Sequence, residues 1–297
     1  MTIYQTITDR ILAQLENGHA PWHRTWQTGL PASLSTGREY RGINILALSL
    51  SDYSSRFWLT FREALRLGGH VRKGEKATPV VYWKWRTQIE LEAAKQKGER
   101  VARCIPFTSS VFNLDQIEGV ERPKNDVLHH GHERLEIADQ LLGVMPNKPE
   151  VSHGLGNQPA YHGDTDRVLL PHLSQFESAD AYFATLFHEL CHATGHQTRL
   201  DRFSREGGSR IEKYSFEELV AEIGAAFLCG FCGIRNPGIE QLQESYVAGW
   251  ARVFQKNSRI LLRAASAAQK AADYIRGKVP VETDGEPESA LSERAAD

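Results

Sequence analysis

The sequence has few cysteines and lacks the features that mark secreted, membrane or fibrous proteins. Only four of its 297 residues are cysteines, which fits a reduced cytoplasmic protein better than a disulfide framework. No apolar run approaches the roughly 18 residues that indicate a membrane span, and the first ten residues lack the pattern of a signal peptide. No repeat of 20–50 residues is visible, which argues against a solenoid. With 41% hydrophobic and 24% charged residues, the composition is that of an ordinary globular protein, and we expect no membrane partner.

The charge is unevenly placed, although the net value of −2 is small. Residues 1–126 carry 18 Lys and Arg against 13 Asp and Glu, a net of +5. The other 171 residues carry 17 against 24, a net of −7. A basic half joined to an acidic half prompts a search for nucleic-acid contacts in the first half.

The patterning predicts an α+β protein with two domains and a disordered tail. We expect a small α+β domain over residues 1–125, a linker over 126–132, a mainly helical domain with a short sheet over 133–280, and an acidic tail over 281–297. The elements expected with the clearest signals are a helix over 3–16, strands over 78–85 and 101–112, and a helix from Ala179. Thr60 and Glu63 have the spacing of a capping box. Further strands are expected around Tyr161 and over 168–170, and a break in helical pattern over 198–215.

The chemistry is concentrated in His188-Glu189-Leu-Cys-His192, an H-E-x-x-H motif. Residues four apart lie on one helix face, so both imidazoles can bind one metal ion. Glu189 points about 100° away from His188 and can act as general base without being a ligand. A pair of surface histidines is the alternative, but Leu186, Phe187 and Leu190 predict a buried helix, and buried polar groups need partners.

A third ligand is required, because catalytic zinc sites usually have three protein ligands and one open position. The sequence begins a His-x-x-Gly-x-x-His pattern at His192, but position 198 is Thr198, and His196 is out of register. Glu218 and Glu222 lie one turn apart on a following helix, so one can be the ligand and the other can orient a ligand histidine. Glu218 has an alternative role, since Ser215-x-x-Glu218 is itself a capping box.

Aromatic and basic residues alternate in the first 86 residues, which hold five of the six tryptophans. Nucleic-acid bases stack on aromatic faces while Lys and Arg contact phosphates, although aromatic residues of small domains are also core residues. The candidates for DNA contact are Trp22, Tyr40, Arg41, Asn44, Trp58, Lys73, Lys76, Tyr82 and Trp83.

Together these stretches resemble the ArdC-type antirestriction proteins, whose N-terminal part is also found in TraC-type plasmid primases. The resemblance is carried by the stretch from Trp22 onward, Gly37–Asn44, Trp58–Phe61, Gly68–Glu75 and Val81–Trp83, then by His188–His196 and Glu218–Phe227. It implies an N-terminal domain that binds single-stranded DNA, a zincin-like metallopeptidase domain, and a product of conjugative plasmids that protects incoming DNA from host restriction. The chain also resembles gluzincins, in which the first Glu of Glu-x-x-Ala-Glu is the ligand; here that is Glu218, with Glu222 behind it.

Three functions remain open on the sequence alone. The first is a metal-dependent peptidase, in which Zn²⁺ is the expected metal, Mn²⁺ or another first-row metal is an alternative, and a host restriction component is a candidate target. The second is a protein that shields single-stranded DNA and whose metal site is structural or vestigial. The third is a nuclease or another metal hydrolase. A nuclease is disfavoured because many nucleases use two metals held by several carboxylates.

Overall fold

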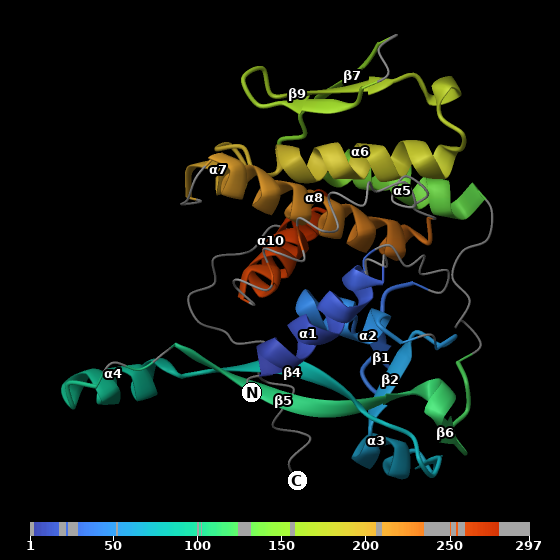
Figure 1. Cartoon of the computed structure of the whole chain (residues 1–297), viewed down its shortest axis with the longest axis vertical. Coiled ribbons are helices and arrows are strands. Elements are labelled where there is room, and N and C mark those ends of the chain that lie inside the picture. Colours follow the sequence, from blue (N-terminus) through green and yellow to red (C-terminus); the bar gives the residue numbers. More distant parts are fainter. Residues whose placement is uncertain are drawn as a thin grey trace.

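The fold was analysed in a computed structural model of the 297-residue chain. The structure describes residues 3–17, 22, 29–51, 53–99, 101, 103–123, 132–154, 158–205, 210–234, 250, 254 and 259–278. Most of the predicted linker and the whole predicted tail lie outside the described residues. Within them, helices form the middle of the molecule, with one sheet above and another below in the view of Figure 1.

The N-terminal half is a mixture of helices and short strands, as expected. Its elements are α1 (Ile3–Glu16), β1 (Ala32–Ser33), α2 (Ile43–Ser49), β2 (Phe57–Thr60), α3 (Phe61–Arg66), β3 (His70–Val71), β4 (Thr78–Trp85), α4 (Gln88–Gln96), β5 (Cys104–Asn113), a 3-10 turn at Leu114–Gln116 and β6 (Ile117–Glu118). Four strands form a sheet in the order β1-β2-β5-β4, and β3 pairs with β6. The predicted helix over 3–16, both predicted strands and the Thr60–Glu63 capping box are confirmed, whereas the short strands carry too few residues to give a pattern.

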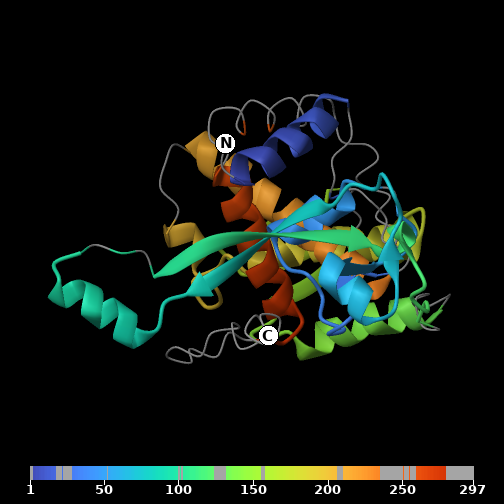
Figure 2. The same cartoon turned by 90° about the horizontal axis from the view of Figure 1, so that it is seen from below.

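Strands β4 and β5 form a long antiparallel ribbon that leaves the body of the molecule. Their ladder runs from Thr78 opposite Val111 to Trp85 opposite Cys104. Figures 1 and 2 show that the ribbon projects well beyond the rest of the fold and carries α4 at its end. A capping box between Thr87 and Glu90 starts α4, which is almost wholly exposed. The charged segment between the two strands, for which the sequence predicts no regular element, is therefore a short surface helix.

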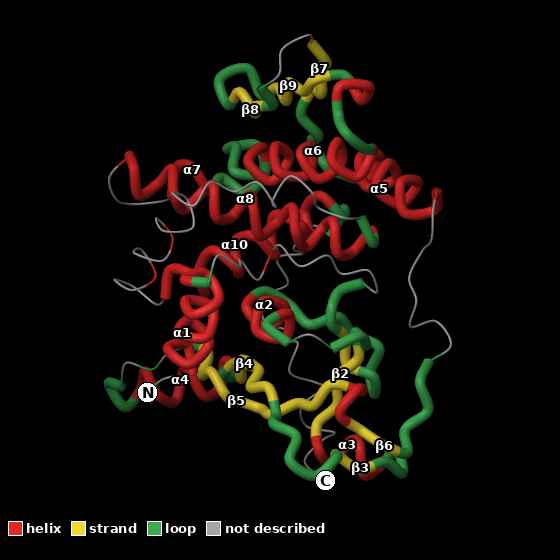
Figure 3. The backbone as a smooth tube through the Cα atoms, turned by 45° about the vertical axis from the view of Figure 1, so that its right-hand side comes forward, coloured by secondary structure: helices red, strands yellow, loops and turns green. Residues whose placement is uncertain are grey.

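The C-terminal half is mainly helical and carries a small sheet. Its elements are α5 (His132–Val144), β7 (Glu150–Gly154), β8 (Ala160–His162), β9 (Arg167–Pro171), a 3-10 turn at Leu173–Gln175, α6 (Ala179–Ala193), α7 (Arg202–Arg205), α8 (Arg210–Cys232) and α10 (Arg259–Ile275). The sheet has the order β7-β9-β8 and lies over α6 (Figure 3). β8 is antiparallel to β9 and forms one edge. Strand β7 is unexpected from the sequence, and α8 begins five residues earlier than predicted.

One hydrophobic core joins the two halves. The same cluster of buried side chains contains Ile7, Ile45 and Val81 from the N-terminal half and Phe187 and Phe227 from the C-terminal half. Helix α10 packs mainly against α8 and also contacts α1, α2, α5 and α6. Its small side chains Ala264, Ala265, Ala268, Ala271 and Ala272 are buried, which lets neighbouring helices approach closely. Figure 3 shows α10 between α8 and α2, at the junction of the halves.

Polar contacts reinforce the junction at the N-terminus of α2. The Gly42 backbone N–H donates to Gln269 Oε1 at 2.9 Å, and the Arg41 guanidinium pairs with Asp273. Arg276 pairs with Glu39 at 3.2 Å. Both α10 and the residues just after it are therefore bound to the segment 39–42.

Candidate metal centre

Helix α6 presents the H-E-x-x-H motif on its surface. The Ser178 hydroxyl accepts a hydrogen bond from the Ala181 N–H and starts the helix, and Leu186, Phe187 and Leu190 bury its opposite side. His188 and His192 lie one turn apart, with their Nε2 atoms 3.1 Å apart. The predicted placement of both imidazoles on one helix face is therefore what the structure shows.

Helix α8 crosses α6 and brings Glu218 to the two histidines. Glu218 Oε2 lies 3.7 Å from His188 Nε2, and Glu218 Oε1 lies 3.6 Å from His192 Nε2. A tetrahedral ion bound at about 2.0–2.1 Å holds its ligand atoms roughly 3.3–3.5 Å apart. These three residues form the group of side chains that could hold a metal ion among the residues that the structure describes. Two imidazole nitrogens and one carboxylate are the donors typical of a catalytic divalent metal.

Glu222 lies behind His188, on the opposite side of its ring from Glu218. Its Oε1 atom is 3.7 Å from His188 Nδ1, whereas Glu218 faces Nε2. The capping-box alternative for Glu218 is wrong, because α8 already begins at Arg210 and Ser215 lies inside the helix. Burial raises the pKa of Glu222 to about 8, with a further contribution from the negative charge of Glu218.

Glu189 lies beside the histidines without joining the ligand group. Its carboxylate accepts a hydrogen bond from the Tyr161 backbone N–H, which places it next to the edge strand β8. Burial raises the pKa of Glu189 to about 7, and Glu218 adds to the shift. Burial also lowers the pKa of His188 to about 4 and that of His192 well below its ordinary value. Both imidazoles are therefore neutral at neutral pH, which is the form that binds metals.

Besides His196, the sequence offers Tyr214 and Tyr246 as groups that could stabilise an oxyanion over a metal, and a Cys-x-x-Cys pair at 229 and 232, although packing explains these residues better. His196 is bonded through Nδ1 to the Thr198 hydroxyl at 2.8 Å in the turn after α6. Tyr214, one turn before Glu218, is exposed and forms a side-chain hydrogen bond with it. Cys229 and Cys232 are buried in α8. Tyr246 lies outside the described residues.

Two arginines near the metal centre gave no recognisable sequence signal. Arg199 has a fully buried side chain that donates to Ala193 O at 2.7 Å and pairs with Asp166. Arg202 is also buried and pairs with Glu217 at 2.8 Å. Single charged residues have no characteristic spacing in the sequence, so only the tertiary structure reveals that these two are buried.

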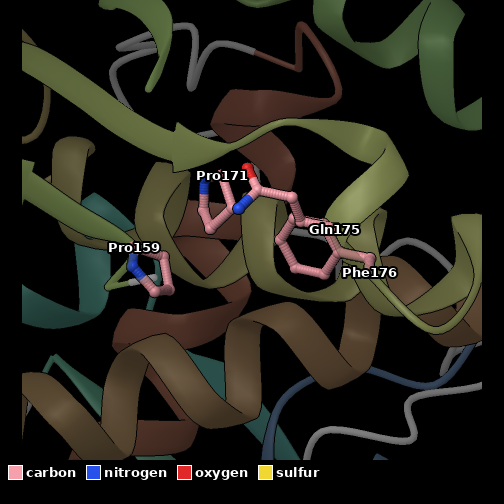
Figure 4. Close-up of a pocket in the computed structure, with 4 residues that line it drawn as sticks. All are labelled: Pro159, Pro171, Gln175 and Phe176. Atoms are coloured by element: carbon pink, nitrogen blue, oxygen red, sulfur yellow. The ribbon is translucent and has the colours of Figure 1, made fainter. Parts of the chain in front are cut away.

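A separate cavity of about 410 Å³ lies beside the small sheet (Figure 4). It is lined by Pro159, Pro171, Gln175 and Phe176. The two prolines flank the β8–β9 ladder, and the other two residues belong to the turn that precedes α6. The histidines and glutamates of the metal centre are not among these lining residues.

The structure separates the candidate DNA contacts into buried and exposed groups. Trp22 and Trp58 are 0% and 2% exposed, and each ring packs against another aromatic ring, Trp250 and Tyr53 respectively. Because a base needs a free ring face, this burial argues against direct stacking on either tryptophan. They are core residues, which composition alone does not distinguish from binding residues.

Three polar candidates have structural partners at the junction or in the sheet. The Asn44 side chain accepts from the Val81 N–H at 2.8 Å and donates to Val81 O at 2.6 Å, so it holds α2 against β4. Tyr40 is half-buried against the core. Arg41 is about half exposed but pairs with Asp273.

The remaining candidates are exposed. Lys73 and Lys76 lie in the turn between β3 and β4, and Tyr82 and Trp83 lie on the ribbon. The Tyr82 ring stacks on Phe107 of β5, with centroids 5.4 Å apart and an angle of 18° between the planes. Phe107 is also exposed and was not among the sequence candidates, because its partner strand is 25 residues away in the chain.

Comparisons with known proteins cover both halves of the chain. Residues 1–112 match the model of the N-terminal domain of anti-restriction factor ArdC, and residues 138–267 match a zincin-like metallopeptidase model. Two DNA primases TraC from Escherichia coli are 35% and 33% identical over 92% of the chain, which spans only 20% and 27% of their lengths. The uncharacterized protein y4eC of Sinorhizobium fredii is 32% identical, with 93% of this chain and 92% of that protein aligned.

Solved structures agree with these sequence matches. The metal-free crystal structure of the antirestriction ArdC protein from plasmid R388 aligns with a TM-score of 0.76 and 35% identity, over 94% of this chain and 98% of that one. Its Mn(II)-bound structure aligns with a TM-score of 0.75 and 34% identity over the same shares. Among the described residues no helix is long and apolar enough to cross a membrane. On the full-length sequence and structural matches, the chain belongs to the ArdC antirestriction family.

Proposed function

We propose that this protein protects incoming DNA from restriction by combining single-stranded DNA binding with a metal-dependent peptidase. The observation that carries the peptidase part is the arrangement of α6 and α8. Two helices bring His188, His192 and Glu218 together as candidate ligands, and Glu189 stays outside this group beside them. A purely structural site does not need a carboxylate in that place.

The residues fit a divalent metal, and each has a separate task in peptide hydrolysis. The metal supplies Lewis-acid polarisation of the peptide carbonyl and makes water a better nucleophile. Glu189 accepts a proton from the attacking water and transfers it to the leaving amine, a role suited to a carboxylate whose pKa lies near 7. Glu222 Oε1 lies 3.7 Å from His188 Nδ1, so its carboxylate favours a proton on Nδ1 and leaves Nε2 free to face the metal. Zn²⁺ is the default for this donor set, and Mn²⁺ is supported by the Mn(II)-bound ArdC structure.

The ribbon of β4 and β5 is the proposed surface for single-stranded DNA. Its strands contain no Asp or Glu, and Lys84 on β4 and Arg103 just before β5 are exposed. Tyr82 and Phe107 form an exposed stacked pair, and neighbouring Trp83 is exposed too. Aromatic faces among positive charges are the combination that binds single strands without strict sequence preference. Lys73 and Lys76 extend the positive charge to the turn before β4.

The test separates peptidase action from DNA shielding. Glu189→Gln keeps the size of the side chain and one acceptor oxygen but removes the base. We expect it to bind metal and single-stranded DNA like the wild type and to lose restriction protection during DNA entry. If Glu189→Gln still protects, the DNA-binding half carries the function and the peptidase proposal is wrong. Labelled single strands incubated with protein and metal should remain intact; cleavage would indicate a nuclease.

A further inference from the structure

Arg202 occupies an unusual place next to the metal centre, although it does not touch a ligand side chain. It begins α7, and its backbone N–H donates to Gly195 O at 2.9 Å, which ties it to the turn after α6. The whole residue is 8% exposed. A guanidinium in such a place must have its N–H groups satisfied by protein, since a buried unpaired charge is strongly unfavourable.

The guanidinium satisfies its donors by joining two helices. Towards α6, Nη2 donates to Cys191 O at 3.0 Å, and Nη1 donates to the Thr194 hydroxyl at 2.9 Å. Towards α8, Nε and Nη2 donate to the two carboxylate oxygens of Glu217 at 2.9 and 2.8 Å. Cys191 directly precedes His192, and Glu217 directly precedes Glu218. Each end of the bridge is therefore one residue from a proposed metal ligand.

We propose that Arg202 is a positioning residue of the metal centre, which fixes α8 against α6 and thereby sets the distance from Glu218 to the histidines. This inference rests on the proposed metal-dependent function. The distances of 3.6–3.7 Å between Glu218 and the imidazoles are close to those in a bound site, so a small shift of α8 would separate the ligands. A bidentate guanidinium–carboxylate pair restricts both distance and angle, which a single ammonium does not.

The pair is better explained by positioning than by stability alone. Buried ion pairs are often matched or exceeded in stability by apolar residues of similar volume, because desolvation cancels much of the Coulomb attraction. If the pair serves stability alone, replacing both partners by apolar residues should leave both folding and metal affinity intact. A positioning role predicts that the same replacement restores folding but not metal affinity.

The experiment uses the full-length protein with Mn²⁺ as probe, followed by the loss of the free-ion signal in electron paramagnetic resonance. The main variant is Arg202→Met with Glu217→Leu, which leaves no unpaired charge. The matched control is Arg134→Met with Asp180→Leu, which removes another arginine–carboxylate pair that joins α6 to α5 instead of α8. We expect the main variant to fold and to bind Mn²⁺ about 10–100-fold more weakly, the usual effect of losing a residue that orients ligands. The control should stay within about threefold of wild type.

Two single variants keep the test decisive if the double variant does not fold. Arg202→Lys retains the charge without the fork, and Glu217→Gln retains the shape without the charge; both should weaken Mn²⁺ binding. The positioning role would be overturned if the folded Arg202 and Glu217 variants bind Mn²⁺ as tightly as the wild type. It would also be overturned if the control variant loses as much Mn²⁺ affinity as they do. A wild-type protein that binds no Mn²⁺ or Zn²⁺, or binds them equally after His188→Ala, would instead overturn the metal centre itself.

Discussion

At the scale of single residues, the metal centre is a set of groups whose charges depend on the metal. Burial lowers the pKa of His188 to about 4 and raises that of Glu222 to about 8. Burial likewise raises the pKa of Glu189, to about 7. Desolvation therefore favours the neutral form of every one of these groups. A divalent cation reverses this preference for the carboxylates, because its positive charge stabilises their ionised form.

The stability of the metal-free protein should fall as pH rises from about 6.5 to 8. Glu189 and Glu222 have folded-state pKa values above their ordinary 4.5, so the native state holds protons that the unfolded chain has lost. The depressed pKa of His188 acts in the opposite direction, but only below its ordinary 6.5. Denaturant unfolding in excess chelator, at several pH values across this window, measures how steeply the free energy of unfolding changes with pH.

Glu222→Gln and saturating Mn²⁺ serve as controls for that slope. The substitution should flatten the fall, since Glu222 no longer titrates. Metal should reverse it, because ligands bind metal in their deprotonated forms. A metal-free stability that increases from pH 6.5 to 8 would contradict the raised pKa values of Glu189 and Glu222.

The sequence predicts part of the site at this scale, for identifiable reasons. His188, Glu189 and His192 follow from helical spacing alone. The choice between Glu218 and Glu222 does not, because both lie on one face, and Ser215 suggested a helix start that the structure moves to Arg210. The burial of Trp22 and Trp58 depends on neighbours such as Trp250, far away in the chain, so residue type could not predict it.

At the scale of elements, Gly224 of α8 lies directly against Cys191 of α6. A Cβ added there would lie 2.6 Å from Cys191 Sγ and 3.5 Å from Cys191 Cβ. Cys191 is fully buried and precedes His192 in α6. This glycine therefore sets how near α8 can come to the helix that carries the histidines.

Gly224→Ala should destabilise the protein and weaken metal binding. The gain in helix propensity is about 1 kcal/mol, whereas overpacking of a core costs about 1–3 kcal/mol, so we expect a small net loss of unfolding free energy. Cys191→Ala in the same chain removes the clash and should restore both properties relative to Cys191→Ala alone. Urea unfolding and Mn²⁺ titration of the wild type, the two single variants and the double variant measure the coupling free energy between Gly224 and Cys191. Additive effects would show that the two residues do not interact.

The ribbon of β4 and β5 should bind single strands through its aromatic pair. Tyr82→Ala or Phe107→Ala should weaken binding of a labelled oligonucleotide by about 5–150-fold, since stacking contributes about 1–3 kcal/mol per base. Tyr82→Phe retains the ring and should bind nearly as well as wild type. Ile89→Ala alters an exposed apolar residue of α4 on the same projection and should have no effect. An affinity unchanged in both alanine variants would remove the ribbon from the proposed surface.

The lysines before the ribbon should act through charge. Lys73→Ala and Lys76→Ala should each reduce the slope of log affinity against log salt by about 0.7, if each contacts one phosphate of a single strand. Fluorescence anisotropy over a salt series measures this slope. If the line of log affinity against log salt shifts without a change in slope, neither lysine binds phosphate.

Elements with strong local signals were predictable, and those defined by pairing were not. The helix over 3–16 and the strand over 78–85 have clear periodicity and are confirmed. Strands β1, β3 and β6 are two residues long and exist because of their partners. Strand β7 pairs with β9 in parallel, a contact that local sequence does not encode.

At the scale of the whole molecule, α10 makes the two halves one structural unit. It packs on α8, which carries Glu218, and binds the segment before α2 through Gln269 and Asp273. The sequence predicted a helical region there but not this role, because a row of buried alanines is compatible with many neighbours.

Metal binding should therefore protect the N-terminal half from unfolding. A ligand at about 100 times its dissociation constant stabilises the native state by about 2.7 kcal/mol. Backbone amides of α2 that exchange only by global unfolding should then exchange about 100-fold more slowly with metal present. Hydrogen–deuterium exchange with and without Mn²⁺ measures this, and His188→Ala should abolish the difference. Slowing confined to α6 and α8 would show that the halves unfold separately.

The late position of α10 in the sequence also determines when the protein can fold during synthesis. A ribosome completes α1, α2 and the β4–β5 ribbon long before it reaches Arg259, yet buried Ile45 and Leu46 share their core with α10. N-terminal domains usually fold first while the rest of a chain is being translated. In this protein the first half retains exposed apolar surface until α10 has been made. We therefore expect the nascent chain to be a better substrate for chaperones than the finished protein, and a chain truncated before Arg259 to aggregate more readily.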